Sequence, residues 1–266
     1  MVLSMTARET SALAVTYVGH ATALIEVDGR RVLTDPLLRL HVGPLIRHSP
    51  VPPASLRAGL SAVVISHAHI DHLDVPSLRL IDKATPVLAP QATKKLLRRI
   101  GFADVTEMEP GQSRDIGGGV VVTATPADHG ATRHPLAEEG NALGFVVRGS
   151  QSAYFAGDTG LFDGMADLAG DLGVALLPVG GWGPRLPDDH LNPLTAAKAL
   201  ALLRPRVAVP IHWGTLYPPW LPPLFNAKFG TWPRSFTRYA AHLAPEVEVR
   251  VLEPGETTVL GGGSAG

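Results

Sequence analysis

The stretch Ser66-His67-Ala68-His69-Ile70-Asp71-His72 decides how the rest of this chain is interpreted. It continues from the run Ala62 to Ser66, which is typical of a short strand buried on both faces. In an extended segment His67 and His69 point to the same side, because side chains alternate. The pair Asp71-His72 comes where the chain turns, so it can point elsewhere. A polar surface loop would also contain such residues, but four potential ligands within six residues after a buried strand predict a loop that serves two adjacent metal ions.

Three further polar residues follow predicted strands. His129 comes after the strand expected at 120–124, Asp158 comes after Ala153-Tyr154-Phe155, and His212 stands at the end of a later strand. A lone histidine or a Gly-Asp turn is more often structural than functional, so none of the three decides the matter alone. Together with the histidine-rich loop they predict a metal site.

The composition fits a chain that folds around a sizeable core. With 266 residues and 45% apolar content, it could form one large domain or two small ones without disulfides. No composition break marks a linker and no repeat is visible, so a single domain over residues 1–266 is expected. The absence of cysteine argues against a disulfide-stapled secreted domain and removes thiolates from any metal site. The metal ligands must then be imidazole and carboxylate.

Charge and hydropathy argue against other classes of protein. Lys plus Arg (23) nearly balance Asp plus Glu (24), whereas a binder of long nucleic acid usually has a strong basic surplus. The basic residues Lys94, Lys95, Arg98 and Arg99 are interpreted as the solvated face of a helix. No apolar run reaches the ~18 residues that span a bilayer, and the start of the chain lacks the pattern of a signal peptide. The sequence predicts a cytoplasmic protein with a small-molecule substrate, no transmembrane segment and no nucleic-acid partner.

The order of predicted elements favours two packed sheets with helices outside, because strands that pair with each other come first and later alternate with helices. Asp28-Gly29 is a hairpin signal, and Asp74 can cap a helix with Pro76 in its first turn. Strands are expected at 14–18, 23–27, 31–34, 62–66, 86–89, 120–124, 144–147, 153–156, 174–178, 207–210, 247–252 and 257–260. Helices are expected at 74–81, 91–100, 161–168, 193–203 and 236–243, and 36–53 is expected to be a long loop.

The order HxHxDH, then histidine, then aspartate, then histidine resembles the metallo-β-lactamase fold superfamily. The resemblance implies an α+β fold, a four-layer αββα sandwich with the site at one edge between the sheets. It also implies two metal ions bridged by Asp158. The first ion would be held by His67, His69 and His129, and the second by Asp71, His72 and His212. The bridging carboxylate and the lack of cysteine point away from true β-lactamases and toward the hydrolase branches of the superfamily.

Further motifs resemble a narrower branch of that superfamily. Val18-Gly19-His20-Ala21-Thr22 and Leu33-Thr34-Asp35-Pro36 are similar to the branch that includes L-ascorbate 6-phosphate lactonase and to N-acylphosphatidylethanolamine-hydrolysing phospholipase D. The phospholipase-D-like proteins are also similar in the stretches Gly180-Gly181-Trp182-Gly183-Pro184-Arg185, His190-Leu191-Asn192-Pro193 and Ile211-His212-Trp213-Gly214-Thr215. The long N-terminal extension of the phospholipase has no counterpart here, so membrane lipids are not the expected substrates.

Two adjacent divalent ions would lower the pKa of a bridging water, orient the substrate and stabilise charge on the attacked centre and the leaving oxygen. Zinc suits imidazole and carboxylate ligands, and manganese or iron also fit. Asp71 is expected to aim the bridging hydroxide as well. His190 is the expected proton donor outside the ligand set, with a surface loop histidine as the alternative. His20 and Asp35 are interpreted as groups that orient ligands, or else as structural residues.

The remaining histidines receive no role. They are His41, His48, His134 and His242, of which the first three could line the mouth of the site.

Four functions follow from these observations. The first is a metal-dependent hydrolase acting on a phosphodiester, and the second is a lactonase or other carboxylic-ester hydrolase, which needs the same activated water. The third, of another class, is a metal-binding protein without turnover; the complete ligand set argues against it. The fourth is a nucleic-acid processor, and the near-neutral charge argues against that one. The sequence does not identify the substrate or the oligomeric state, because fold does not imply function.

Overall fold

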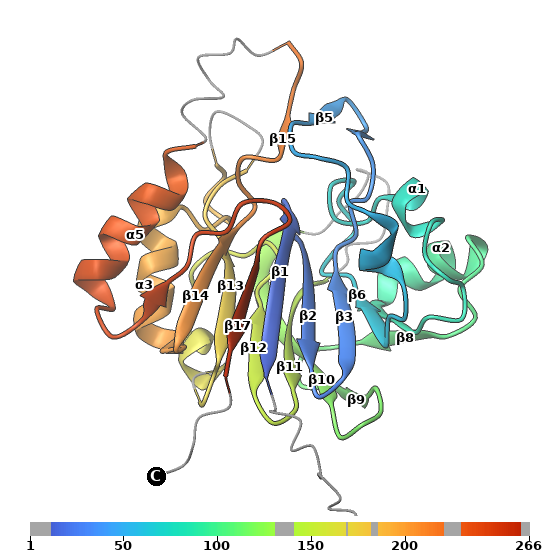
Figure 1. Cartoon of the computed structure of the whole chain (residues 1–266), viewed down its shortest axis with the longest axis horizontal. Coiled ribbons are helices and arrows are strands. Elements are labelled where there is room, and N and C mark those ends of the chain that lie inside the picture. Colours follow the sequence, from blue (N-terminus) through green and yellow to red (C-terminus); the bar gives the residue numbers. More distant parts are fainter. Residues whose placement is uncertain (1–11, 131–140, 169, 182–185, 221–229, 262–266) are drawn as a thin grey trace, which may run out of the picture.

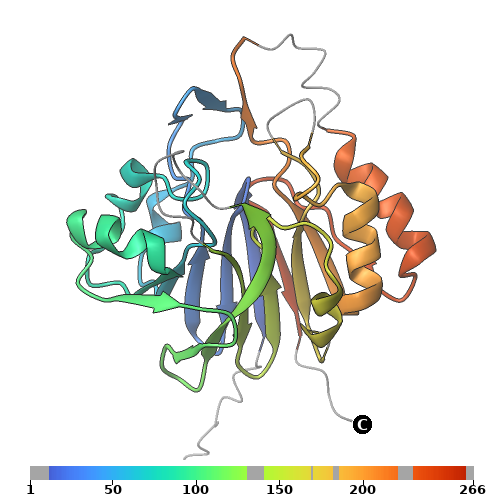
Figure 2. The same ribbon diagram turned by 180° about the vertical axis from the view of Figure 1, so that it is seen from behind.

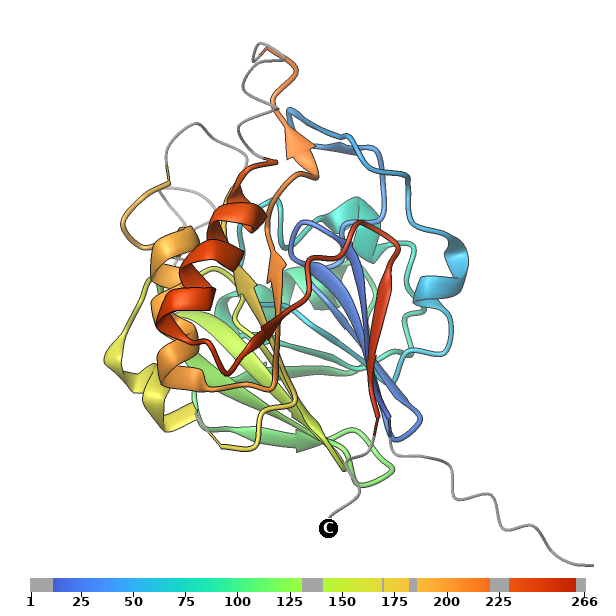
Figure 3. The same cartoon turned by 60° about the vertical axis from the view of Figure 1, so that its left-hand side comes forward.

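A computed structural model describes residues 12–130, 141–168, 170–181, 186–220 and 230–261. The strands described form two seven-stranded sheets and one sheet of three short strands. The two large sheets pack face to face, and helices cover the outer face of each (Figures 1 and 3). The α+β class and the four-layer αββα order expected from the sequence are confirmed.

The first large sheet is antiparallel on one side and parallel on the other. Its strands β1, β2 and β3 form an antiparallel meander, and β17 pairs antiparallel with β1. From β3 onward, β6, β7 and β8 pair in parallel. At the β2–β3 turn, Asp28 and Gly29 have φ values of 47° and 72°, the left-handed conformations that a two-residue hairpin needs. The bounds are Leu13–Gly19 (β1), Thr22–Val27 (β2), Arg30–Thr34 (β3), Ala62–Val64 (β6), Val87–Pro90 (β7), Val105–Met108 (β8) and Thr257–Leu260 (β17).

The second large sheet has the same mixed character. Strands β9 to β12 pair antiparallel, and β12, β13, β14 and β16 then pair in parallel. The long central pair β10–β11 has its register shifted between Pro126 and Gly130, next to His129. The bounds are Ser113–Asp115 (β9), Val121–Gly130 (β10), Asn141–Arg148 (β11), Ser152–Phe155 (β12), Val174–Pro178 (β13), Val207–Ile211 (β14) and Glu248–Val249 (β16).

Helices lie on the two flanks of the sheet pair (Figure 2). On the side of the first sheet are α1 (Val75–Leu78) and α2 (Lys94–Arg99), and on the side of the second are α3 (Pro193–Leu203) and α5 (Trp232–Leu243). Asp74 caps α1 by accepting a hydrogen bond from the Ser77 amide, and Asn192 caps α3 through a capping box. Short 3-10 helices cover Ala54–Arg57 (η1), Gln91–Thr93 (η2) and Asp163–Leu168 (η3).

The alternation of side chains along the strands separates two hydrophobic cores. In β3, Val32 points into the core between the sheets, and its neighbour Leu33 points into the core beneath α1 and α2. In β6, Val64 and Val63 divide in the same way. A strand buried on both faces must be apolar throughout, which explains the continuous apolar run before the histidine-rich loop.

The histidine-rich loop leaves the carboxyl end of β6, at the edge of the sheets that is uppermost in Figure 1. Above this edge stands the three-stranded sheet, formed by β4 (His41–Val42), β5 (Leu45–Arg47) and β15 (Leu216–Tyr217). Arg47 joins it to the first sheet, since its buried guanidinium donates to the carbonyl oxygens of Val18 and Leu37 at 3.2 and 2.6 Å. The ends of β6, β12 and β14 and this small sheet thus surround one site.

Several local predictions were wrong in extent or type. The expected loop 36–53 contains β4 and β5, which pair with each other, and β15 from far along the chain pairs with β5. The expected strand 247–252 is reduced to β16 (Glu248–Val249), and the expected helix 161–168 is the 3-10 helix η3 (Asp163–Leu168). The expected helix 74–81 is the single turn α1 (Val75–Leu78). The last helix begins at Trp232 rather than 236, because Pro233 suits a first helical turn.

Besides β4 and β5, three further strands were not predicted. They are β8, β9 and β15, which are short and lie at sheet edges or in the small sheet. β9 has the sequence Ser-Arg-Asp and offers no apolar pattern from which a strand could be predicted. None of the helices that the structure describes has the length and apolar composition needed to span a bilayer.

Candidate metal centre

The loop after β6 is held between the two sheets by its backbone. The Ser66 amide donates to Asp35 Oδ1 at 2.7 Å, and the Leu143 amide of the second sheet donates to the Ser66 carbonyl at 2.9 Å. Gly157 allows this close approach, because a Cβ there would lie 2.6 Å from the Ser66 Cβ and its φ is +63°. The loop then turns, since the amides of His72 and Leu73 both donate to the His69 carbonyl.

The first cluster of side chains consists of His67, His69 and His129. The Nε2 atom of His67 lies 2.9 Å from His69 Nδ1, and the Nε2 atom of His129 lies 3.3 Å from the same nitrogen. His67 and His69 therefore do point to one side of the loop, as the alternation along the chain predicts. His129 reaches them from the end of β10.

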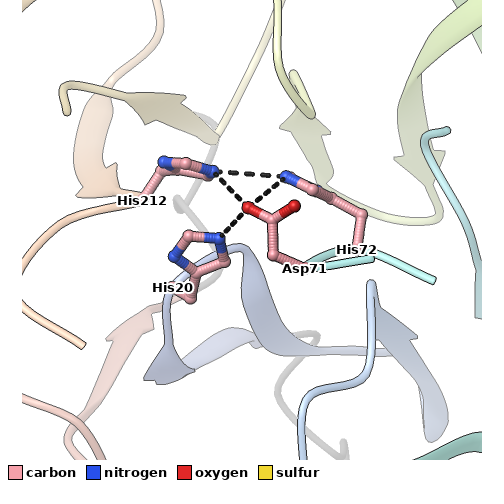
Figure 4. Close-up of side chains that lie close together, drawn as sticks. All are labelled: His20, Asp71, His72 and His212. Atoms are coloured by element: carbon pink, nitrogen blue, oxygen red, sulfur yellow. Dashed lines mark hydrogen bonds and ion pairs between the residues drawn. The ribbon is translucent and has the colours of Figure 1, made fainter. Parts of the chain in front are cut away.

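The second cluster consists of Asp71, His72 and His212, with His20 beside them (Figure 4). The two Nε2 atoms of His72 and His212 lie 3.2 Å apart. Asp71 Oδ2 lies 3.7 Å from the former and 3.8 Å from the latter. All four side chains are buried, so water reaches them poorly.

Asp158 stands between the two clusters. Its Oδ2 lies 3.2 Å from His72 Nε2, and its Oδ1 lies 3.3 Å from His212 Nε2. Asp158 also groups with His129 and His190 as a set of ligand atoms within 4.8 Å of one another. Although Asp158 Oδ1 is buried, it accepts no hydrogen bond from the described residues. An orphaned buried carboxylate oxygen is costly unless a cation is bound there.

The contacts behind the rings determine where the imidazole protons lie. Nδ1 of His212 faces the Gly180 carbonyl at 3.0 Å, and Nδ1 of His72 faces Asp35 Oδ2 at 2.7 Å. Carbonyl and carboxylate oxygens only accept, so both Nδ1 atoms carry protons. In the neutral rings both Nε2 atoms then present lone pairs to each other across 3.2 Å. Such an arrangement is repulsive on its own and is what a shared cation requires.

The same reasoning applies to the first cluster. The Ser66 hydroxyl donates to Asp35 Oδ2 at 2.5 Å, so it accepts from His67 Nδ1 at 2.9 Å. This leaves the lone pair of His67 Nε2 facing His69. His129 likewise donates from Nδ1 to the carbonyl oxygen of Asp189 at 3.2 Å, and its Nε2 faces His69.

Distances between the ligand atoms fit metal coordination. Two ligands at ~2.0 Å from a tetrahedral zinc ion lie about 3.3 Å apart. The separations His129–His69, His72–His212 and His212–Asp158 are 3.3, 3.2 and 3.3 Å. The donor set of imidazole and carboxylate suits zinc, manganese or iron. The residues present therefore fit divalent metal ions.

Electrostatics also suit a metal centre. Burial lowers the pKa of His67 well below its usual range, and burial also lowers the pKa values of His69 and His129, so these rings are neutral. Burial would lower the pKa of His72 too, but Asp158 and Asp71 outweigh it and raise that pKa well above its ordinary value. In the metal-free protein a proton thus occupies the place of a cation among these groups.

Asp71 and His20 form a buried pair. His20 Nε2 donates to Asp71 Oδ2 at 2.9 Å, and burial, followed by the nearby His212, lowers the pKa of His20 to about 3. His20, Asp35 and His212 all have positive φ, with values of 56°, 32° and 61°. Strained backbone of this kind concentrates at functional sites. The structure places His20 against Asp71 and Asp35 against His72.

His190 lies at the rim of the site. Its Nε2 is 3.3 Å from Asp158 Oδ2, and its Nδ1 is 3.1 Å from Asp189 Oδ1. Burial would lower the pKa of His190, but the two carboxylates raise it. The raised pKa favours a protonated ring beside the candidate metal ligands.

Other residues singled out from the sequence lie elsewhere. His41 and His48 are exposed on the three-stranded sheet, where the His48 ring packs edge-on against Tyr217 at 4.7 Å. His242 is on α5, away from the site. His134 and the Trp182–Arg185 part of the Gly180–Arg185 motif lie outside the described residues.

Sequence reasoning missed one residue of the site, Asp189. Its carboxylate contacts both His129 and His190. The only signal was its position directly before His190, and that position does not reveal the contact with His129, 60 residues earlier.

Comparison with known proteins agrees with this geometry. Residues 30–213 match a family model described as a beta-lactamase superfamily domain. A UPF0173 metal-dependent hydrolase of Aeropyrum pernix is 34% identical over 266 residues, covering 91% of this chain and 95% of its own. An N-acyl-phosphatidylethanolamine-hydrolyzing phospholipase D of Caenorhabditis elegans is 33% identical over 236 residues, covering 78% of this chain and 65% of its own. Among solved structures, Igni18, a metallo hydrolase from Ignicoccus hospitalis, is similar with a TM-score of 0.71 and 26% identity, covering 94% of this chain and 98% of its own.

Proposed function

The chain belongs to the beta-lactamase superfamily, and from that premise we propose that it uses two divalent metal ions to hydrolyse a small-molecule phosphodiester. It is a metal-dependent hydrolase of this superfamily, as similar proteins are. The observation that carries the dinuclear proposal is the pair of adjacent clusters joined by Asp158, in which imidazole nitrogens face one another at 3.2 and 3.3 Å.

Each cluster would hold one ion. His67, His69 and His129 would hold the first, Asp71, His72 and His212 would hold the second, and Asp158 would be a ligand to both. Zinc is the metal we favour, and manganese or iron would suit the same donors. When bound, the two ions supply a water of lowered pKa and stabilise negative charge at the attacked centre.

Residues of the chain would orient the metal ligands and the attacking water. Asp35 fixes the proton of His72 on Nδ1 directly and that of His67 through Ser66, which keeps both Nε2 lone pairs available. Asp71 is held by His20. Its Oδ2 lies farther from the Nε2 atoms of His72 and His212 than these two nitrogens lie from each other. That oxygen therefore also suits a role in orienting the attacking water.

His190 is proposed as the general acid. The two carboxylates that flank it keep a proton on the ring. In hydrolysis that proton would pass from Nε2 to the leaving oxygen, so that the leaving group departs as an alcohol. The exposed fraction of the His190 side chain is 15%, which suits a residue that meets the substrate at the rim.

The phosphodiester is the substrate class we favour over a lactone or carboxylic ester. The similarity to a phospholipase D, which cleaves a phosphodiester, supports this choice. The near-neutral net charge of −1 supports a small molecule rather than a long nucleic acid.

The test is hydrolysis of bis(p-nitrophenyl) phosphate by zinc- and manganese-loaded protein, with His129→Ala as the matched control. Turnover that is lost in the variant is expected. If the protein hydrolyses aryl esters or lactones but not the phosphodiester, the substrate is a carboxylic ester or lactone and the phosphodiester proposal is wrong. Two bound metal ions without hydrolysis of any of these substrates would favour a metal-binding protein without turnover.

A further inference from the structure

We propose that Asp189 is a positioning residue that holds His190 through its carboxylate and His129 through its backbone carbonyl and its carboxylate, so that metal binding and proton transfer depend on the same residue. The inference rests on the roles proposed above for the two histidines. It concerns how those histidines are held, and it does not depend on which ester is the substrate.

Each oxygen of the Asp189 carboxylate contacts a different histidine ring. Asp189 Oδ2 lies 3.0 Å from His129 Nδ1, and Asp189 Oδ1 lies 3.1 Å from His190 Nδ1. Since a carboxylate oxygen only accepts, both Nδ1 atoms donate. The hydrogen bond of His129 Nδ1 is with the carbonyl oxygen of Asp189 at 3.2 Å, and Oδ2 lies beside the same nitrogen as an ion-pair contact.

The opposite nitrogens of these rings point into the site. His129 Nε2 faces His69 Nδ1 at 3.3 Å, and His190 Nε2 faces Asp158 Oδ2 at 3.3 Å. The two rings stand perpendicular with centroids 4.5 Å apart. Rotation of either ring would break its hydrogen bond to Asp189, so this residue fixes the direction of both Nε2 atoms.

Asp189 is itself held from both sides of the site. The Gly130 amide, at the end of β10, donates to Oδ2 at 3.2 Å. On the other side, the Leu191 amide donates to the Thr159 carbonyl at 2.7 Å, next to Asp158. The capped start of α3 follows directly at Asn192. The carboxylate thus has little freedom to move away from the two histidines.

A solvated surface carboxylate would not show these contacts. The exposed fraction of the Asp189 side chain is 36%, yet both of its oxygens are used. Its neighbour Asp188 is exposed, and no side-chain contact of Asp188 with a histidine of the site is found among the described residues. Asp188 is therefore the matched control for charge and position in the chain.

The experiment compares Asp189→Ala, Asp189→Asn and Asp188→Ala in the full chain, each checked for its fold by circular dichroism. Zinc affinity is measured by competition with a chromogenic chelator, and kcat is measured in the zinc-loaded proteins. Histidine ring protons of the metal-free proteins are observed by long-range ¹H–¹⁵N NMR. Asp189→Ala is expected to weaken zinc binding and lower kcat by roughly 10–100-fold each. It is also expected to remove the Nδ1 proton of His190, whereas His129 keeps the carbonyl oxygen of residue 189 as its acceptor. Asp189→Asn, which keeps one side-chain acceptor, should fall between.

A double-mutant cycle distinguishes positioning from a general structural effect. In a His190→Ala background, Asp189→Ala should no longer lower kcat, while its effect on zinc affinity through His129 persists. An equal loss of kcat in both backgrounds would overturn the link to His190. If Asp189→Ala has the same zinc affinity and the same ring-proton signals as Asp188→Ala, the proposal as a whole is overturned. If wild-type protein hydrolyses no ester, the proposed function fails, but the NMR and chelator measurements still test Asp189.

Discussion

The carboxylate of Asp35 and the imidazole of His72 meet at 2.7 Å, between Oδ2 and Nδ1, although 37 residues separate them in the chain. Both side chains are fully buried. The contact depends on the parallel pairing of β3 with β6, because Asp35 follows the first strand and the histidine-rich loop follows the second. It turns the Nε2 lone pair of His72 toward His212 and Asp158.

Asp35→Asn should weaken metal binding by roughly 10–100-fold while the fold is kept. Asparagine tolerates the positive φ of this position, but its amide can donate to His72 Nδ1 and thereby favour the wrong tautomer. The measurement is chelator competition, with the thermal unfolding midpoint as the check on folding. Wild-type affinity in this variant would show that the tautomer of His72 does not depend on Asp35.

His67→Ala and His129→Ala should each lose metal and activity together, because each removes one of three nitrogens of the first cluster. Metal content by elemental analysis and turnover of bis(p-nitrophenyl) phosphate are measured on the same samples. His242→Ala, on α5 and away from the site, is the matched control. Turnover at the wild-type rate in His67→Ala or His129→Ala would refute the assignment of that ligand.

His190→Ala should keep its metal ions and lower kcat by about 10²–10⁴-fold, the usual range for a lost general acid. The loss should be smaller for substrates with a better leaving group, since these need less protonation. A variant that instead releases metal would make His190 a ligand, which its position near His129 and Asp158 also allows.

Metal binding should tighten as the pH rises. Asp158 and Asp71 hold the pKa of His72 above its ordinary value despite burial, so the metal-free site retains a proton that a cation must displace. Below that pKa, each pH unit should change the dissociation constant by about tenfold for one displaced proton. Isothermal titration in buffers of different ionisation enthalpy counts the protons released. An affinity that does not vary with pH would contradict this competition.

Removal of metal should destabilise the protein. Ligand binding at 100 times its dissociation constant stabilises the folded state by about 2.7 kcal/mol, which corresponds to a shift of about 5–10 °C for a chain of this size. Scanning calorimetry with and without a chelator measures the difference. This shift in unfolding temperature should vanish in a double variant that combines His129→Ala and His72→Ala. If the shift persists in that variant, the stabilising metal binds elsewhere.

The local motif was sufficient to predict the centre of the site. His67, His69, Asp71 and His72 are close together in sequence, and strand alternation alone predicts that the first two converge. Asp158 and His212 could be predicted from their order after strands, because the strand ends meet at one edge.

Contacts between distant segments could not be predicted in this way. Asp189 meets His129 only because the end of β10 lies beside the loop before α3. The pairing of β15 with β5 likewise joins chain segments near 216 and 45, and neither segment has a strong pattern of its own. Such features depend on tertiary packing rather than on local propensity.

The central claim, that two metal ions work together in one site, is tested most directly by titrating metal-free protein with zinc. Bound metal and turnover of bis(p-nitrophenyl) phosphate are followed in the same samples. We expect saturation at two ions per chain, with turnover that rises mainly with the second equivalent. Saturation of turnover at one ion, or full turnover in metal-free protein, would contradict the claim.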